Sequence, residues 1–253
     1  MVNASAAQRM HPTRAAALFC TALAAVVAIA LAAGCSTGGG EEDVVGADYG
    51  EPTPARETSG PASLGEVEVT EYQGQDLSST DDFRENSIAG PQYLDMDDYA
   101  LKIHGLVNTP LELTYDEVLD RQTYEKVVTL NCVEGWSVTI LWEGVLIEDL
   151  LDEAGIDPDA NTVIFRAYDG YSTSLPLDYI LDRDILLAYA MNGRVMPPER
   201  GYPFQVVAED KWGYKWCKWV TEIELSDDPD YEGYWESRGY NNRGDAGGPK
   251  FSD

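Results

Sequence analysis

The residues with the clearest chemical potential stand close together at Cys132, Glu134 and Trp136. A cysteine can serve as a small buried apolar residue, as half of a disulfide, or as a reactive or metal-binding thiolate. Cys132 follows the β-branched run Val127–Leu130, which predicts a strand. If the strand continues past the cysteine, the three side chains alternate onto one face. A core strand seldom buries Glu beside Cys, so the pattern favours a site over a core layer.

The chemistry of the sulfur depends on its possible partners. Gly135 would let a ligand or another backbone approach this stretch closely. Cys217 is the other cysteine of the folded part, and a Cys132–Cys217 disulfide is one interpretation for an exported chain. The sequence contains no CxxCH motif, which argues against a covalently attached haem. His104 is the only histidine besides His11, which excludes zinc or copper centres built from several histidines.

Residues 1–34 are typical of a bacterial lipoprotein signal. Arg9 and Arg14 precede the apolar run Ala15–Ala33, and small residues lead up to Cys35, which would carry the lipid. The two arginines are not adjacent, so the signal lacks a twin-arginine pair. An uncleaved membrane anchor is the alternative. Both interpretations predict an exported protein, and the first predicts a lipid anchor on the outer face of the cytoplasmic membrane.

The chain is strongly acidic, with 45 Asp and Glu against 17 Lys and Arg. Removing the signal removes Arg9 and Arg14 and leaves 15 basic residues, a formal charge of −30. This balance argues against binding to nucleic acid or to an anionic lipid surface and indicates a self-repelling, soluble surface. Lys211, Lys215 and Lys218 form a local exception that needs an explanation.

Composition divides the remainder into four parts. Residues 35–65 are rich in Gly, Glu, Asp and Pro and are predicted to be a flexible acidic tether. Residues 66–98 are predicted to be an N-terminal arm, in which 66–70 could be a short strand. The compact domain is expected over 99–235, followed by a C-terminal tail over 236–253.

Within the domain, alternation and turn residues predict many short strands and a few short helices. Thr114–Glu117 is a capping box that begins a helix, and Gly155 ends a second helix that starts at Leu146. A third helix starts at Pro176. The predicted strands cover 99–107, 127–132, 137–142, 162–167, 171–175, 185–190, 204–208 and 216–225. This pattern indicates a β-rich α+β fold.

Several stretches, taken in order, resemble the sulfite-oxidase superfamily of molybdenum-cofactor enzymes, and within it the branch of the periplasmic methionine-sulfoxide reductase catalytic subunit. The similarity extends from about residue 83 to residue 245 and implies a mixed, β-rich molybdopterin-binding fold. The motifs are Leu101–Leu106 ahead of Thr114–Leu119, Asn131–Trp136, Asp169–Tyr171, Pro197–Phe204 and Lys211–Trp219.

The resemblance implies a pyranopterin-bound molybdenum with Cys132 as its protein thiolate. Glu134 would deliver protons or orient water, although hydrogen bonding to nearby backbone N–H groups would explain it equally well. The lysine-rich stretch would bind the terminal phosphate of the pterin through the backbone N–H groups of Trp216 and Cys217 and the ammonium of Lys218. A strand edge guarded by lysines is the structural alternative. The implied cofactor-binding residues are Asn86, Cys132, Arg200, Lys215, Trp216, Cys217 and Lys218.

Two departures from the family pattern concern the substrate. Gln205 stands where relatives often have an arginine, and basic residues that would bind sulfite are absent from the sequence around Cys132. We therefore expect a molybdenum oxidoreductase that transfers an oxygen atom to or from a small sulfoxide-like or other oxo compound. It would exchange two electrons with a membrane haem protein or a quinone-linked carrier. The alternative is a non-catalytic lipoprotein binding module on the same scaffold.

Overall fold

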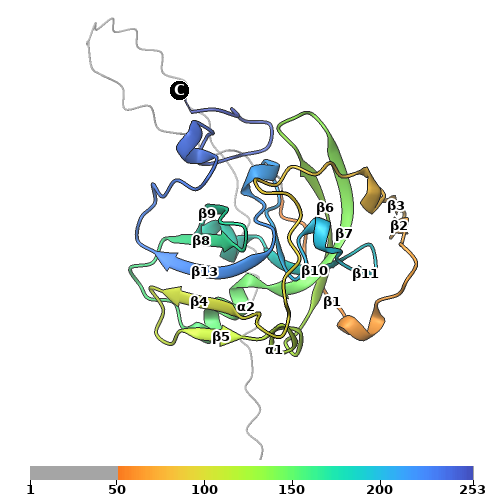
Figure 1. The fold of residues 1–253 in the computed structure, drawn as a ribbon, viewed down its shortest axis with the longest axis horizontal. Helices are drawn as coiled ribbons and strands as arrows, with labels where there is room; N and C mark the ends of the chain where they lie inside the picture. Colours follow the sequence, from red (N-terminus) through yellow and green to blue (C-terminus); the bar gives the residue numbers. More distant parts are fainter. Residues whose placement is uncertain (1–50, 253) are drawn as a thin grey trace, which may run out of the picture. The chain divides into compact units, whose positions relative to one another are not determined.

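The computed structural model describes residues 51–252 (Figure 1). The predicted signal, Cys35 and the start of the tether lie outside the described residues. Within the described range, no helix combines the length and apolar character that crossing a membrane requires.

Two β-sheets form the framework of the fold. In the first sheet all strands are antiparallel, in the order β1-β6-β7-β10-β11, with β12 also paired to β10. These strands are β1 Arg56–Glu57, β6 Tyr124–Asn131, β7 Ser137–Leu146, β10 Leu186–Met191, β11 Arg194–Val195 and β12 Gln205–Val207.

The second sheet has the order β5-β4-β13-β8-β9. Its one parallel pair joins β4 to β13, and the other neighbours are antiparallel. Its strands are β4 Leu101–Gly105, β5 Leu111–Leu113, β8 Thr162–Ala167, β9 Ser172–Pro176 and β13 Val220–Ser226. Separately, β2 Glu71–Tyr72 and β3 Gln75–Asp76 form a small hairpin.

The helices begin and end where the sequence predicts. Thr114 caps α1 (Tyr115–Leu119) in a reciprocal capping box with Glu117. The helix α2 (Ile147–Ala154) ends at Gly155, whose φ of 75° suits a residue without Cβ. Its apolar face is buried, which stabilises the helix more than its short length could. The third helix, α3, covers Leu177–Asp182. Five short 3-10 helices complete the described elements: η1 Pro61–Ser63, η2 Thr80–Asp82, η3 Pro198–Arg200, η4 Gly213–Lys215 and η5 Glu236–Arg238.

The expectation of a flexible tether up to residue 65 is wrong from about residue 53 onward. Arg56–Glu57 pairs with β6, and Thr58 donates its backbone N–H to the carbonyl of Thr123 at 2.9 Å. The Thr58 hydroxyl also donates to the buried carboxyl of Glu143 at 3.1 Å. Backbone pairing and these polar contacts order a segment that is too polar to form a core of its own.

The strand predicted over 216–225 begins only at Val220. Trp219 has a φ of 50°, outside the extended region, and donates its backbone N–H to the carbonyl of Gly201 at 3.3 Å. The preceding residues, Trp216–Lys218, therefore run as irregular chain and do not belong to the ladder with β8.

Candidate active site

Cys132 lies at the end of the longest hairpin of the fold, formed by β6 and β7. Every second side chain of β6 is buried, including Val128 and Leu130, and Cys132 continues this buried face with 8% of its surface exposed. The hydrophobic pattern of the strand therefore fixes the side on which the sulfur emerges.

The strand itself does not continue past the cysteine, contrary to the expectation. The last ladder pair is Asn131 with Ser137, after which Cys132 donates its N–H to the carbonyl of Trp136 at 2.9 Å. Gly135 closes a turn by donating to the carbonyl of Cys132 at 3.0 Å, with a φ of 88°. A Cβ at Gly135 would meet no atom within 4 Å, so the glycine serves the turn conformation and not a close approach.

Cys132, Glu134 and Trp136 nevertheless line one cavity. Its walls come from the N-terminal arm, the hairpin turn, the β8–β9 turn, the region of η3, the segment after Lys211 and the C-terminal part of the chain. Six residues selected from the sequence contribute to these walls: Asn86, Cys132, Glu134, Arg200, Trp216 and Lys218. Tertiary structure thus brings together residues that the chain separates by more than a hundred positions.

The two other selected residues do not line the cavity. Lys215 is buried, and its ammonium lies 2.7 Å from Oε1 of Glu236. Cys217 is fully buried, and burial raises the pKa of its thiol. Cys132 and Cys217 are both free, so the disulfide interpretation is wrong. Cys217 packs in the hydrophobic core, whereas Cys132 lines the cavity.

The lysine cluster divides into two roles. Lys211 and Lys215 form ion pairs with Asp245 and Glu236 of the C-terminal part, at 2.6 and 2.7 Å. Lys218 alone of the three lines the cavity, where its Nζ lies 3.2 Å from Oε2 of Glu85. Two of the three lysines of this segment therefore bind the C-terminal part of the chain.

The structure places only part of the predicted anion site at the cavity. The N–H of Trp216 donates to the carbonyl of Gly213 at 3.1 Å, so it is already used. Within residues 51–252, by contrast, no acceptor takes the N–H of Cys217. Cys217 is fully buried and does not line the cavity, however, so of the predicted anion-binding groups Lys218 is the one that could bind an anion there.

Arg200 attaches the N-terminal arm to the cavity wall. Its Nε donates to the carbonyl of Thr80 at 3.2 Å and its Nη2 to that of Phe83 at 3.4 Å. The guanidinium also lies 5.1 Å from the centre of the Phe83 ring. These contacts position the arm segment that carries Arg84 and Asn86, both of which line the cavity.

Burial raises the pKa of the Cys132 thiol. The backbone N–H of Glu134 and the charges of Lys250 and Arg84 act in the opposite direction, but burial prevails. A free Cys132 is consequently a neutral thiol and a poor nucleophile at neutral pH. Coordination to a metal ion would hold the same sulfur as a thiolate.

The cavity fits a ligand that brings its own metal and its own polar atoms. The indole Nε1 of Trp136 is buried beside Cys132 and has no hydrogen-bond partner among the described residues. Over the same residues, no group of three or more His, Cys, Asp or Glu could hold a metal ion. A metal bound to Cys132 would need ligands from an organic cofactor, and the unpaired Trp136 donor suits an acceptor of such a group.

Comparison with known proteins agrees with this geometry. The oxidoreductase molybdopterin binding domain family matches residues 88–235. The chain belongs to this family. It is therefore a molybdenum-cofactor oxidoreductase with the β-rich fold of the sulfite-oxidase superfamily, as the motifs predict.

Three curated relatives show how far the sequence similarity extends. The uncharacterized oxidoreductase YuiH of Bacillus subtilis is 38% identical over 61% of this chain and 78% of its own. The putative protein-methionine-sulfoxide reductase subunit YedZ1 of Azospira oryzae is 32% identical over 58% of this chain and 56% of its own. Human mitochondrial sulfite oxidase is 30% identical, but the match covers 34% of that protein. The chain thus spans about half or less of the length of the two relatives with named activities.

A solved structure supports the fold. The sulfane dehydrogenase SoxCD of Paracoccus pantotrophus superposes with a TM-score of 0.56 at 24% identity, over 76% of this chain and 57% of that one. At this identity the likeness concerns architecture and carries no activity.

Several cavity residues were not selected from the sequence, and three of them are informative. Arg84 comes from the arm, and Trp235 and Tyr240 come from the C-terminal part. The dense aromatic stretch after Tyr231 was a usable signal, because so many aromatic residues seldom gather in a solvated tail.

Proposed function

We propose that this molybdenum oxidoreductase is exported and lipid-anchored, and that it transfers an oxygen atom to or from a small oxo substrate with Cys132 as the protein ligand of the metal. The observation that carries the site is the position of Cys132, a buried free thiol that lines the cavity. The same cavity is lined by the Trp136 indole, which has no hydrogen-bond partner within residues 51–252. When bound, the cofactor supplies two-electron redox chemistry.

The residues of the chain would bind and orient this group. Cys132 is held by the hairpin turn at the end of β6, and Lys218 would bind an anionic end of the cofactor. Asn86 and Arg200 line the cavity and would contact the cofactor from the arm and from η3. Glu134 is exposed at the cavity, where its carboxylate is suited to exchanging protons with solvent.

The substrate side of the proposal rests on the relatives and on two residues. The relative YedZ1 is named as a putative protein-methionine-sulfoxide reductase subunit, which supports a sulfoxide-like substrate. Gln205 also lines the cavity and can donate a hydrogen bond to an oxo group without adding charge. Arg84 lines the cavity as well, so the site contains a basic residue that the sequence around Cys132 does not show.

The electrons would be exchanged with a separate membrane haem protein or a quinone-linked carrier. The chain has no haem-attachment motif of its own, and the lipoprotein-type signal would keep the domain at the membrane surface. The non-catalytic binding module, which was the alternative, is disfavoured by membership of an oxidoreductase family.

Metal analysis of the full-length protein tests the site. We expect the wild type, expressed in a host that makes the cofactor, to hold molybdenum in proportion to protein, and Cys132→Ser to lose it. Cys217→Ser is the matched control, because Cys217 is buried away from the cavity, and we expect it to retain the metal. Retention of molybdenum by Cys132→Ser would overturn the assignment. A screen of free and protein-bound sulfoxides with an artificial electron donor then tests the substrate class.

A further inference from the structure

The C-terminal part of the chain folds back against the hairpin turn that carries Cys132. Residues 236–252 lie beyond the family-matched region, which ends at residue 235. They form a loop closed by an antiparallel bridge between Tyr240 and Phe251, with the Asn241 N–H donated to the Lys250 carbonyl at 3.1 Å. The aromatic rings of Tyr240 and Phe251 pack with their centres 5.0 Å apart. The predicted tail is thus an ordered element.

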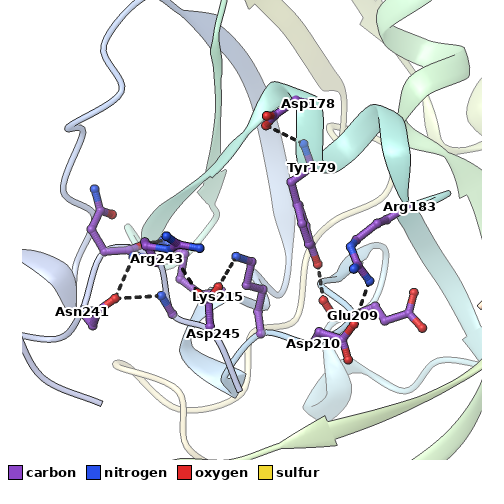
Figure 2. Close-up of polar contacts among 12 residues, drawn as sticks. Asp178, Tyr179, Arg183, Glu209, Asp210, Lys215, Asn241, Arg243 and Asp245 are labelled. Atoms are coloured by element: carbon purple, nitrogen blue, oxygen red, sulfur yellow. Dashed lines mark hydrogen bonds and ion pairs between the residues drawn. The ribbon is translucent and has the colours of Figure 1, made fainter. Parts of the chain in front are cut away.

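This loop is fixed to the lysine-rich segment by main-chain and side-chain bonds. Trp212 donates its N–H to the carbonyl of Gly244 at 2.6 Å, and the ammonium of Lys215 donates to the carbonyl of Asn242 at 2.8 Å. Asp245 accepts from Lys211 at 2.6 Å and from Arg243 at 3.1 Å. Figure 2 shows Asn241, Arg243 and Asp245 of this loop close to one another. Gly244 approaches Lys215 so closely that a Cβ would lie 2.4 Å from its Cγ. The position of the loop is therefore closely determined.

The anchored loop delivers one charged group to the turn. Nζ of Lys250 donates to the carbonyl of Val133 at 2.6 Å and lies 5.2 Å from the centre of the Trp212 ring. Although the chain has 45 acidic residues, Lys250 forms no ion pair with a carboxylate in residues 51–252. Its ammonium group instead donates to the carbonyl of Val133, the residue next to Cys132.

The hydrogen bond from Lys250 satisfies a carbonyl that the turn itself leaves without a donor. The hydrogen bonds within the turn use the carbonyls of Cys132 and Trp136 and leave the Val133 carbonyl for an outside donor. Glu134 and Gly135 are exposed, so packing restrains this part of the hairpin weakly. A charged donor at 2.6 Å adds the restraint that packing does not provide.

We propose that Lys250 is a positioning residue for the molybdenum site, holding the Cys132 turn in the geometry that presents its sulfur to the metal. This inference rests on the proposed role of Cys132 as ligand. In this proposal the C-terminal loop, which lies beyond the family-matched region, helps to position the metal ligand.

The test compares Lys250→Met, Lys250→Arg and Lys102→Met in the molybdenum-loaded full-length protein. Lys102 is an exposed lysine of β4, outside the cavity, and serves as the matched control. We expect Lys250→Met to release molybdenum on the order of tenfold faster during dialysis, the effect of losing one charge-assisted hydrogen bond. Lys250→Arg should restore much of the retention, and Lys102→Met should match the wild type.

Hydrogen–deuterium exchange of the turn gives a readout that does not depend on activity. We expect faster exchange over residues 133–136 in Lys250→Met, with the core strands unchanged. Wild-type retention and wild-type exchange in Lys250→Met would overturn the proposal. If Lys250→Met does not fold, Lys250→Gln takes its place with the same expectation. Loss of molybdenum in Cys132→Ser together with wild-type behaviour of Lys250→Met refutes this inference alone, whereas retention in Cys132→Ser refutes the proposed function.

Discussion

Lys215 and Glu236 form an ion pair of 2.7 Å in which 1% and 0% of the two side chains are exposed. Oε1 of Glu236 also accepts from the Thr173 hydroxyl at 2.5 Å, while its Oε2 has no partner among the described residues. The pair joins the lysine-rich segment to the first residue beyond the family-matched region. Lys215, which the family resemblance implied to be a cofactor-binding residue, therefore holds the C-terminal part of the chain in place.

Breaking this pair is expected to destabilise the protein strongly. Lys215→Met leaves the Glu236 carboxylate buried without its counter-charge, which costs about 3–5 kcal/mol of unfolding free energy. The double variant Lys215→Met with Glu236→Leu removes both charges and should recover a large part of that loss. Chemical denaturation monitored by tryptophan fluorescence measures both. A loss of less than about 1 kcal/mol in Lys215→Met, the range of exposed pairs, would contradict the structural role.

Lys218 and Glu85 should affect cofactor retention in opposite directions. Burial acts to raise the pKa of Glu85, but hydrogen bonds from Ser87 and the charge of Lys218 outweigh it and lower the pKa, so Glu85 is an anion beside the lysine. A bound anionic group would compete with that carboxylate for Lys218. We expect Lys218→Met to reduce the cofactor content of purified protein several-fold and Glu85→Gln to raise it or leave it at saturation.

The measurement is molybdenum and pterin per protein after dialysis. Glu153→Gln removes a different, more exposed ion pair with Arg121, at 2.8 Å, and serves as the control. Equal loss of cofactor in Glu85→Gln and Lys218→Met would show that the pair acts as a structural unit and does not compete with the ligand.

Glu143 should give the stability of the protein a distinct pH dependence. Burial raises the pKa of its carboxyl, although Tyr189 and Thr58 donate hydrogen bonds to it at 2.7 and 3.1 Å. A carboxyl with a raised pKa in the folded state stabilises that state below its unfolded pKa, about 4.3, and this contribution is lost as pH rises through the folded value. Glu143→Gln keeps an acceptor for Tyr189 and carries no charge at any pH.

We therefore expect Glu143→Gln to become more stable relative to the wild type as pH rises from about 4 to 8. Urea denaturation of both proteins across this range isolates the effect, because the other titrating groups are common to the two. A difference in unfolding free energy between the two proteins that stays constant with pH would contradict the assignment of Glu143 as a buried, titrating acid. So would a wild type that gains stability relative to Glu143→Gln as pH rises.

Much of the fold followed from local pattern. The capping box at Thr114 begins α1, Gly155 ends α2, and the strand over Thr162–Ala167 has the bounds that alternation and turn residues predict. Such features depend on interactions within a few residues, which the sequence displays directly. The order of the motifs around Cys132 also indicated the family, and the matched region confirms it.

The site required the tertiary structure. Sequence reasoning could select Cys132 from the residue types around it, but whether its sulfur faces Cys217 or a cavity depends on how two sheets pack. The three lysines are equivalent in the sequence, but Lys211 and Lys215 pair with Asp245 and Glu236 of the C-terminal part. Lys218 instead pairs with Glu85 and lines the cavity.

Long-range contacts also decided the role of both ends of the described chain. Polar composition predicted a tether and a tail, yet Thr58 bonds to Glu143 and Lys250 to Val133 over distances in sequence that no local pattern encodes. Composition reports whether a segment can form a core by itself, and these two segments cannot. Whether such a segment is ordered on a core made by the rest of the chain depends on donors and acceptors that only the folded domain brings within reach.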